Sequence, residues 1–160
     1  MFEIVLLNPK IPQNVGAIGR SCVCAGARLN VIAPTPIDFG EKRLRRAGLD
    51  YWRHLDFAYW DSLDEFLAAH PIGENHYFFT TKCDRPYFRA EFRKGDFLWF
   101  GGEDCGLPEG FWRAYEGQAL SLPMRAGFRS LNLATVVSAA IYEGIRQNYD
   151  LWKLDFGGFG

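Results

Sequence analysis

The chain has 160 residues, of which 48% are apolar and 16% aromatic, and this composition excludes an intrinsically disordered protein. Its formal net charge is −1, so any binding to nucleic acid must depend on local basic patches. No apolar stretch approaches the roughly 20 residues that cross a bilayer, and the first residues lack the features of a secretory leader. We expect one soluble, cytoplasmic domain over residues 1–160.

Short apolar runs alternate with segments of helical periodicity. In chain order we predict a strand at 3–7, a helix at 16–25, a strand at 29–33, a basic helix at 41–48, a strand at 55–60, a helix at 62–70, strands at 77–81, 96–100 and 118–122, and a long helix at 131–147. This alternation indicates an α/β fold with a three-layer, mostly parallel sheet. We expect residues 149–160 to form a flexible tail.

Three loops rich in glycine, proline and asparagine follow predicted strands, and the first spans residues 8–16. Asn14 or its neighbour is expected to cap the next helix. Arg20 lies four residues after Gly16 and so shares its face near the first turn. A cation near the start of a helix interacts unfavourably with the helix dipole, so Arg20 in that place indicates a bound anion such as a phosphate or carboxylate. The alternative is that Arg20 forms a structural ion pair.

The second loop, residues 100–108, places Gly101 directly after a strand and Glu103 and Gly106 beyond it. Its backbone can pass over an adenosine-like group, with Glu103 either binding ribose hydroxyls or pairing with an arginine. The loop lacks the Lys-Ser/Thr ending of a P-loop, and no G-x-G-x-x-G follows the first strand. These absences argue against nucleotide hydrolysis.

In the third loop, residues 122–133, Ser130 and Asn132 stand where the loop becomes the long helix. Either side chain can cap that helix, or both can face a ligand. Leu122 and Met124 would form an apolar floor for a flat purine. Because ligands bind at the carboxyl ends of parallel strands, we expect the three loops to converge into one site.

Basic residues cluster in two places, each with aromatic residues nearby. Such patches suit RNA, although a solvated charged face is the alternative. The clusters are Lys42, Arg43, Arg45, Arg46 and Arg53, and Lys82, Arg85, Arg89, Arg93 and Lys94. The four cysteines and three histidines have no zinc-site or disulfide-framework spacing, so we expect free thiols and no metal.

From about residue 4 to about residue 147, the order and spacing of motifs resemble the SPOUT superfamily of knotted RNA methyltransferases. Within it, the likeness is to the small enzymes that methylate the ribose 2′-oxygen of the wobble nucleotide of tRNA. In chain order the motifs are Asn8-Pro9, Ile11-Pro12-x-Asn14-x-Gly16 with Arg20, Lys42-Arg43-Leu44-Arg45-Arg46-Ala47-Gly48-Leu49-Asp50-Tyr51, Thr80-Thr81-Lys82, Phe100-Gly101-x-Glu103-x-x-Gly106-Leu107-Pro108, Pro123-Met124, Arg129-Ser130-Leu131-Asn132-Leu133 and Tyr142-Glu143.

The resemblance implies a deep trefoil knot in the C-terminal part, a homodimer, S-adenosylmethionine as cofactor and tRNA as partner, with leucine isoacceptors as substrates. Arg20, Ser130 and Asn132 are the expected catalytic residues, with Arg20 entering the partner's pocket. The cofactor contacts are expected at Phe79, Thr80, Gly101, Glu103, Gly106, Leu122, Met124, Ser130 and Leu131. The RNA contacts are expected at Lys42, Arg43, Arg45, Arg46 and Lys82.

The role of Arg20 has more than one reading. Similar enzymes are usually described with this arginine as general base, but a guanidinium stays protonated because its pKa exceeds about 12. Arg20 could equally orient a phosphate or stabilise an incipient alkoxide. For the whole protein, the alternatives are 2′-O-methylation at another tRNA or rRNA position, and a non-catalytic RNA-binding dimer with a vestigial pocket.

Overall fold

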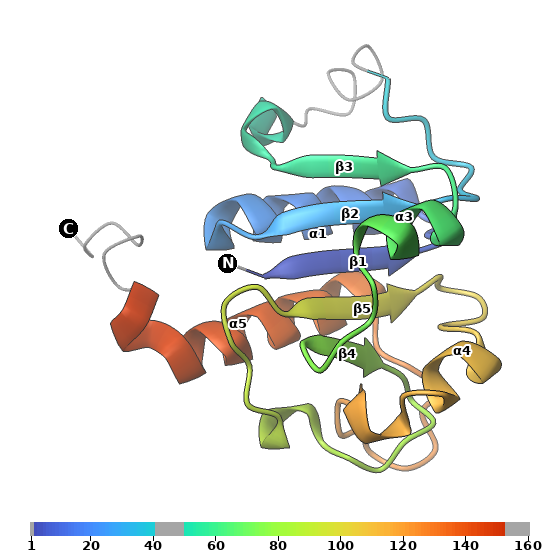
Figure 1. Ribbon diagram of the computed structural model, residues 1–160, viewed down its shortest axis with the longest axis vertical. Coiled ribbons are helices and arrows are strands. Elements are labelled where there is room, and N and C mark those ends of the chain that lie inside the picture. The colour runs from blue at the N-terminus through green and yellow to red at the C-terminus, as the bar shows by residue number, and fades with distance from the viewer. Residues whose placement is uncertain (1, 41–49, 153–160) are drawn as a thin grey trace.

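Six strands form one sheet in the order β3-β2-β1-β5-β4-β6 in the computed structural model, which describes residues 2–40 and 50–152 (Figure 1). All the strand pairs are parallel. The strands are β1 (Glu3–Leu7), β2 (Arg28–Ile32), β3 (Phe57–Trp60), β4 (His76–Phe79), β5 (Phe97–Gly101) and β6 (Ala119–Leu120). The predicted strands and parallel α/β sheet are therefore confirmed.

Helices cover both faces of the sheet. They are α1 (Pro12–Ala25), α3 (Leu63–Ala69), α4 (Glu109–Arg113) and α5 (Leu133–Trp152), with 3-10 turns η1 (Asp50–His54), η2 (Tyr87–Arg89) and η3 (Glu116–Gln118). Ile4 and Leu6 of β1 pack in the cluster that includes α1 and α5, whereas Val5 and Leu7 pack in the cluster that includes α3 and α4. Burial on both sides explains why the central strands β1 and β5 consist almost entirely of apolar residues, as expected for a parallel sheet.

Helix boundaries differ from the prediction at several points. α1 begins at Pro12, four residues before the predicted start, because proline suits the first position of a helix. α5 runs to Trp152, with non-helical backbone at Asn148, so residues 149–152 are helical although they were expected in the tail. The short helix α4 was not predicted, and the predicted basic helix at 41–48 lies outside the described residues. Within the described ranges, no helix is long and apolar enough to cross a membrane.

The buried imidazole of His76 lies between two aromatic residues of the neighbouring strand. Trp99 Nε1 donates a hydrogen bond of 3.0 Å to His76 Nδ1, and the ring centroid of Phe97 lies 4.3 Å from that of His76. Burial, with a smaller contribution from the charge of His70, lowers the pKa of His76 to about 4. The imidazole is therefore neutral in the folded protein at neutral pH.

We expect His76 to make the fold acid-sensitive. Its pKa is about 4 in the folded state against a usual value of 6.5, so the unfolded chain takes up the proton first. The contribution of neutral His76 to the free energy of unfolding is fully present above the usual pKa of 6.5. It decreases as the pH falls towards the pKa of about 4 in the folded state. The loss between pH 7 and pH 5 is roughly 2 kcal/mol. Urea unfolding of the parent and of His76→Asn, which keeps an acceptor for Trp99, would reveal this loss as a difference in pH dependence. Equal slopes in the two proteins would contradict it.

Candidate functional site

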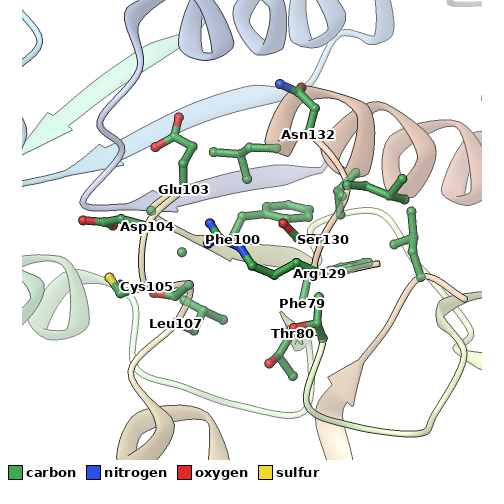
Figure 2. A pocket seen from close by; sticks show the side chains of 18 of the residues that line it. Phe79, Thr80, Phe100, Glu103, Asp104, Cys105, Leu107, Arg129, Ser130 and Asn132 are labelled. Carbon is green, nitrogen blue, oxygen red and sulfur yellow. Dashed lines mark hydrogen bonds between the residues drawn. The ribbon is translucent and has the colours of Figure 1, made fainter. Parts of the chain in front are cut away.

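A cavity of about 600 Å³ lies at the carboxyl ends of β4, β5 and β6, where the three loops converge (Figure 2). Its volume lies within the range of about 300–1,000 Å³ typical of small-molecule pockets. Every residue predicted to contact a cofactor lines it, namely Phe79, Thr80, Gly101, Glu103, Gly106, Leu122, Met124, Ser130 and Leu131. Asn132 and Lys82 also line it, whereas Arg20 does not.

Two phenylalanines form a flat part of the cavity wall. Phe79 of β4 is opposite Phe100 of β5, and their ring centroids lie 4.6 Å apart with 22° between the planes. Leu122 and Leu133 extend this apolar lining. The wall therefore suits a planar, largely apolar group such as a purine.

The backbone of the second loop folds tightly on itself beside this wall. A Cβ added at Gly101 would lie 1.9 Å from the carbonyl carbon of Gly106 and 2.1 Å from the nitrogen of Leu107. Gly106 has a φ of +67°, and its N–H donates to the Gly102 carbonyl at 2.8 Å. Only glycine fits at residue 101, so peptide groups rather than side chains line this part of the cavity.

Glu103 fastens the second loop to the first. Its carboxylate accepts hydrogen bonds from the backbone N–H groups of Lys10 (2.7 Å) and Ile11 (3.2 Å) and from Asn14 Nδ2 (2.8 Å). The carboxylate also places negative charge at the start of α1, which favours the helix dipole. These bonds hold the second loop to the first, and no arginine is among the partners of Glu103 in the described residues.

Asn14 connects this carboxylate to the third loop. Asn14 is 7% exposed, and its Oδ1 accepts a 2.9 Å hydrogen bond from Asn132 Nδ2. Asn132 Oδ1 in turn accepts from the N–H groups of Ala134 (2.9 Å) and Thr135 (3.3 Å). Asn132, rather than Ser130, therefore caps α5. The prediction that Asn14 caps α1 is wrong, because the helix begins two residues earlier and has no side-chain cap.

Removing one charge-bearing oxygen from this hydrogen-bond network is expected to destabilise the protein. In Glu103→Gln, the new NH₂ group must face either the Lys10 N–H or the pair of donors from Ile11 and Asn14. An unpaired donor at such a site costs about 1–3 kcal/mol. Urea unfolding would measure the loss, with the neighbouring exposed Asp104→Asn as the control. A stability equal to that of the parent would refute this role of Glu103.

The cations around the site have different partners. Arg20 is exposed on the third turn of α1, so the predicted first-turn position and its dipole argument are wrong. Its guanidinium carbon lies 4.9 Å from the ring centroid of Tyr51. Lys82 forms an ion pair of 3.1 Å with Glu109 at the rim. The other residues predicted to bind RNA, Lys42, Arg43, Arg45 and Arg46, lie outside the described residues.

Sequence reasoning gave no site role to several lining residues with polar side chains, including Thr81, Asp104, Cys105 and Arg129. Arg129 extends into the cavity in Figure 2, and Asp104 and Cys105 lie on its rim. The Asp104 side chain is hydrogen-bonded to the Cys105 thiol and raises the pKa of that thiol. Between residues 2–40 and 50–152, no group of three or more metal-ligating side chains is placed to hold an ion.

Known proteins resemble this chain over most of its length. The SpoU rRNA Methylase family model matches residues 1–142, which include the three loops. A Burkholderia ambifaria protein named tRNA (cytidine(34)-2'-O)-methyltransferase is 37% identical over 149 residues, covering 92% of this chain and 96% of that protein. A solved structure described as insights into the 2-OH methylation of C/U34 on tRNA is 40% identical, with a TM-score of 0.84, and covers 93% of this chain and 91% of its own.

A more distant structure was solved with a small molecule bound. It is the SpoU methyltransferase AviRb from Streptomyces viridochromogenes in complex with the cofactor AdoMet, which is S-adenosylmethionine. It is 26% identical, has a TM-score of 0.75, and covers 92% of this chain and 57% of that one.

Proposed function

Because this chain belongs to the SpoU rRNA methylase family, we propose that it transfers a methyl group from S-adenosylmethionine to the ribose 2′-oxygen of tRNA nucleotide 34. The observation that carries this proposal is near full-length similarity, at 37% identity, to a protein named for that reaction. We extend the proposal to leucine isoacceptors as substrates and to the cytoplasm as location. We also treat residues 1–160 as one methyltransferase domain.

The cavity fits S-adenosylmethionine in size and lining. The stacked wall of Phe79 and Phe100 suits the adenine ring, and the tight backbone at Gly101 leaves room beside it. A relative of 26% identity binds this cofactor. The residues that would hold it are Phe79, Thr80, Gly101, Glu103, Gly106, Leu122, Met124, Ser130 and Leu131. When bound, the cofactor supplies a methyl group that its sulfonium already activates.

The chain's own contribution is alignment of the ribose hydroxyl with that methyl group. Holding two reactants in line is worth up to roughly 7–11 kcal/mol in well-aligned systems. The bonds among Glu103, Asn14 and Asn132 fix the loops that would do this. Since both ends of the Asn132 amide are occupied, we assign Asn132 a positioning role and leave Ser130 to contact the cofactor or ribose.

We further propose a homodimer in which Arg20 reaches the partner's cavity. Arg20 is exposed and lies outside the lining of the cavity in its own chain, which supports action in trans. Tyr142 of α5 is 53% exposed and offers apolar surface for an interface. A permanently protonated guanidinium can hold a phosphate next to the reacting ribose or stabilise the developing alkoxide.

We also infer a C-terminal trefoil knot. In the sheet, β5 lies between β1 and β4, so the order of the last three strands in space differs from their order in the chain. After the edge strand β6, residues 121–132 return to α5, which packs against α1 near the middle of the sheet. This return of the last segment towards the middle of the sheet supports the inferred knot.

The proposed function is tested with unmodified leucine tRNA transcripts and labelled S-adenosylmethionine, followed by nuclease digestion and mass mapping. We expect one ribose methyl group at nucleotide 34 and none on a transcript with a 2′-deoxy nucleotide there. A methyl group at another tRNA position, or on ribosomal RNA only, would support the same-class alternative. RNA binding without cofactor binding in calorimetry would instead identify a non-catalytic RNA-binding protein.

A further inference from the structure

The turn η1 packs on the face of α1 that carries Gly16, Gly19 and Arg20. The Tyr51 hydroxyl donates a short hydrogen bond to the Gly16 carbonyl. A Cβ added at Gly19 would lie only 3.0 Å from the Trp52 ring, so the missing side chain lets this aromatic pair approach the helix. Above the Tyr51 ring lies the Arg20 guanidinium, 4.9 Å from its centroid.

Tyr51 therefore contacts the helical turn between Gly16 and Arg20 twice, through its hydroxyl and through its ring. In an α-helix the carbonyl of residue 16 accepts the backbone N–H of residue 20. The Tyr51 hydroxyl is bonded to that same carbonyl, while the Tyr51 ring supports the side chain. Burial raises the pKa of Tyr51, which keeps its hydroxyl protonated and donating at neutral pH.

Support by a ring has a chemical advantage over support by a carboxylate. A guanidinium stacked on an aromatic ring uses its face, so its N–H donors stay free in the plane. An ion pair would occupy some of these donors. Among the described residues no carboxylate pairs with Arg20, so its contact there is the Tyr51 ring.

We propose that Tyr51 is a positioning residue for the methyl transfer, holding the Arg20 guanidinium over its ring so that the N–H donors meet the anionic oxygen of the RNA substrate. This inference rests on the proposed function and on Arg20 being essential. It places the effect of Tyr51 on turnover and not on cofactor binding.

The kinetic test compares Tyr51→Leu, which removes the ring, with Tyr51→Phe, which keeps the ring and removes the hydroxyl. Displacement of an aligned group by about 1 Å can reduce a rate about 100-fold, so we expect kcat of the leucine variant to fall between about 10-fold and 100-fold. The phenylalanine variant should stay within about threefold of the parent, because its cation–π contact remains. Cofactor affinity in calorimetry should not change in either variant.

Tyr59→Leu is the matched control, because Tyr59 is another tyrosine close to η1 and is 44% exposed. It packs on Phe39 and should leave kcat unchanged. Thermal unfolding checks that each variant folds. In an Arg20→Ala background, Tyr51→Leu should cause no further loss in single-turnover rate. A kcat at the parent level in Tyr51→Leu would overturn the proposal, as would equal losses in the leucine and phenylalanine variants.

A spectroscopic readout does not depend on activity. The ring current of Tyr51 should shift the side-chain NMR resonances of Arg20 in the parent and in Tyr51→Phe, and this shift should vanish in Tyr51→Leu. Unshifted Arg20 resonances in the parent would refute the stack without any variant. If the parent shows the shift but methylates no RNA, the proposed function fails and the contact stands.

Discussion

Arg20→Ala is expected to lose methyl transfer while keeping its cofactor affinity. Arg20 lies outside the cavity lining of its own chain, so its removal leaves the proposed cofactor contacts in place. Removal of one donor that stabilises developing negative charge typically lowers kcat about 100- to 1,000-fold. Single-turnover methylation of the tRNA transcript measures the rate, and calorimetry with S-adenosylmethionine measures the affinity.

Arg28→Ala is the control for the loss of one positive charge from a partly exposed arginine. Arg28 begins β2, at the amino end of the strands, and its guanidinium lies 3.4 Å from Asp56. Its loss should leave the rate within about twofold, since exposed ion pairs contribute little. Parent-level methylation by Arg20→Ala would remove Arg20 from the mechanism, and Tyr51 with it.

Gly101→Ala is expected to lower cofactor affinity at least about 100-fold, which corresponds to roughly 2.7 kcal/mol. The new Cβ would lie 1.9 Å from the Gly106 carbonyl carbon. Backbone atoms cannot change rotamer to relieve such a contact, so the second loop must open and the cavity must change shape. The strain should also reduce the free energy of unfolding by about 1–3 kcal/mol.

Calorimetry and urea unfolding measure these two effects. Gly110→Ala is the matched control, because a Cβ there meets nothing within 4 Å and its position in α4 favours alanine. The affinity of Gly110→Ala for S-adenosylmethionine should equal that of the parent. An unchanged affinity in Gly101→Ala would show that the cofactor does not bind beside this loop.

These two variants together test action in trans. A mixed dimer of Arg20→Ala and Gly101→Ala protomers contains one intact cavity, and the other protomer supplies an intact Arg20 to it. The assay uses a cofactor concentration that saturates the parent cavity but not the Gly101→Ala cavity. If Arg20 acts on the partner's cavity, each mixed dimer should then show about half of the parent rate, whereas each variant alone shows little activity. Failure to restore activity in a confirmed mixed dimer would place Arg20 at its own chain's site.

The sequence predicts the strands well because the central strands are buried on both faces of the parallel sheet and are therefore rich in apolar residues. It predicts helix ends less well. Pro12 and Asn14 have the composition of a loop, yet they form the first turn of α1. α4 is only five residues long and contains Gly110, so it gives no periodic signal.

Loop composition predicted the lining of the cavity but not the bonds within it. The partners of Asn14 are 89 and 118 residues away, so nothing local identifies it as the link between Glu103 and Asn132. The role of Glu103 stayed open for the same reason. The place of Arg20 depended on where α1 begins, which the sequence put four residues too late.

The bonds among Glu103, Asn14 and Asn132 have a consequence for synthesis on the ribosome. β1 and β5 can pair, and α1 can pack on them, before the residues that follow β5 have been made. The cavity is complete only when residue 132 has emerged and α5 has docked on α1, since the amide of Asn132 closes the last link. A nascent chain that stops before residue 132 therefore lacks the link that completes the cavity.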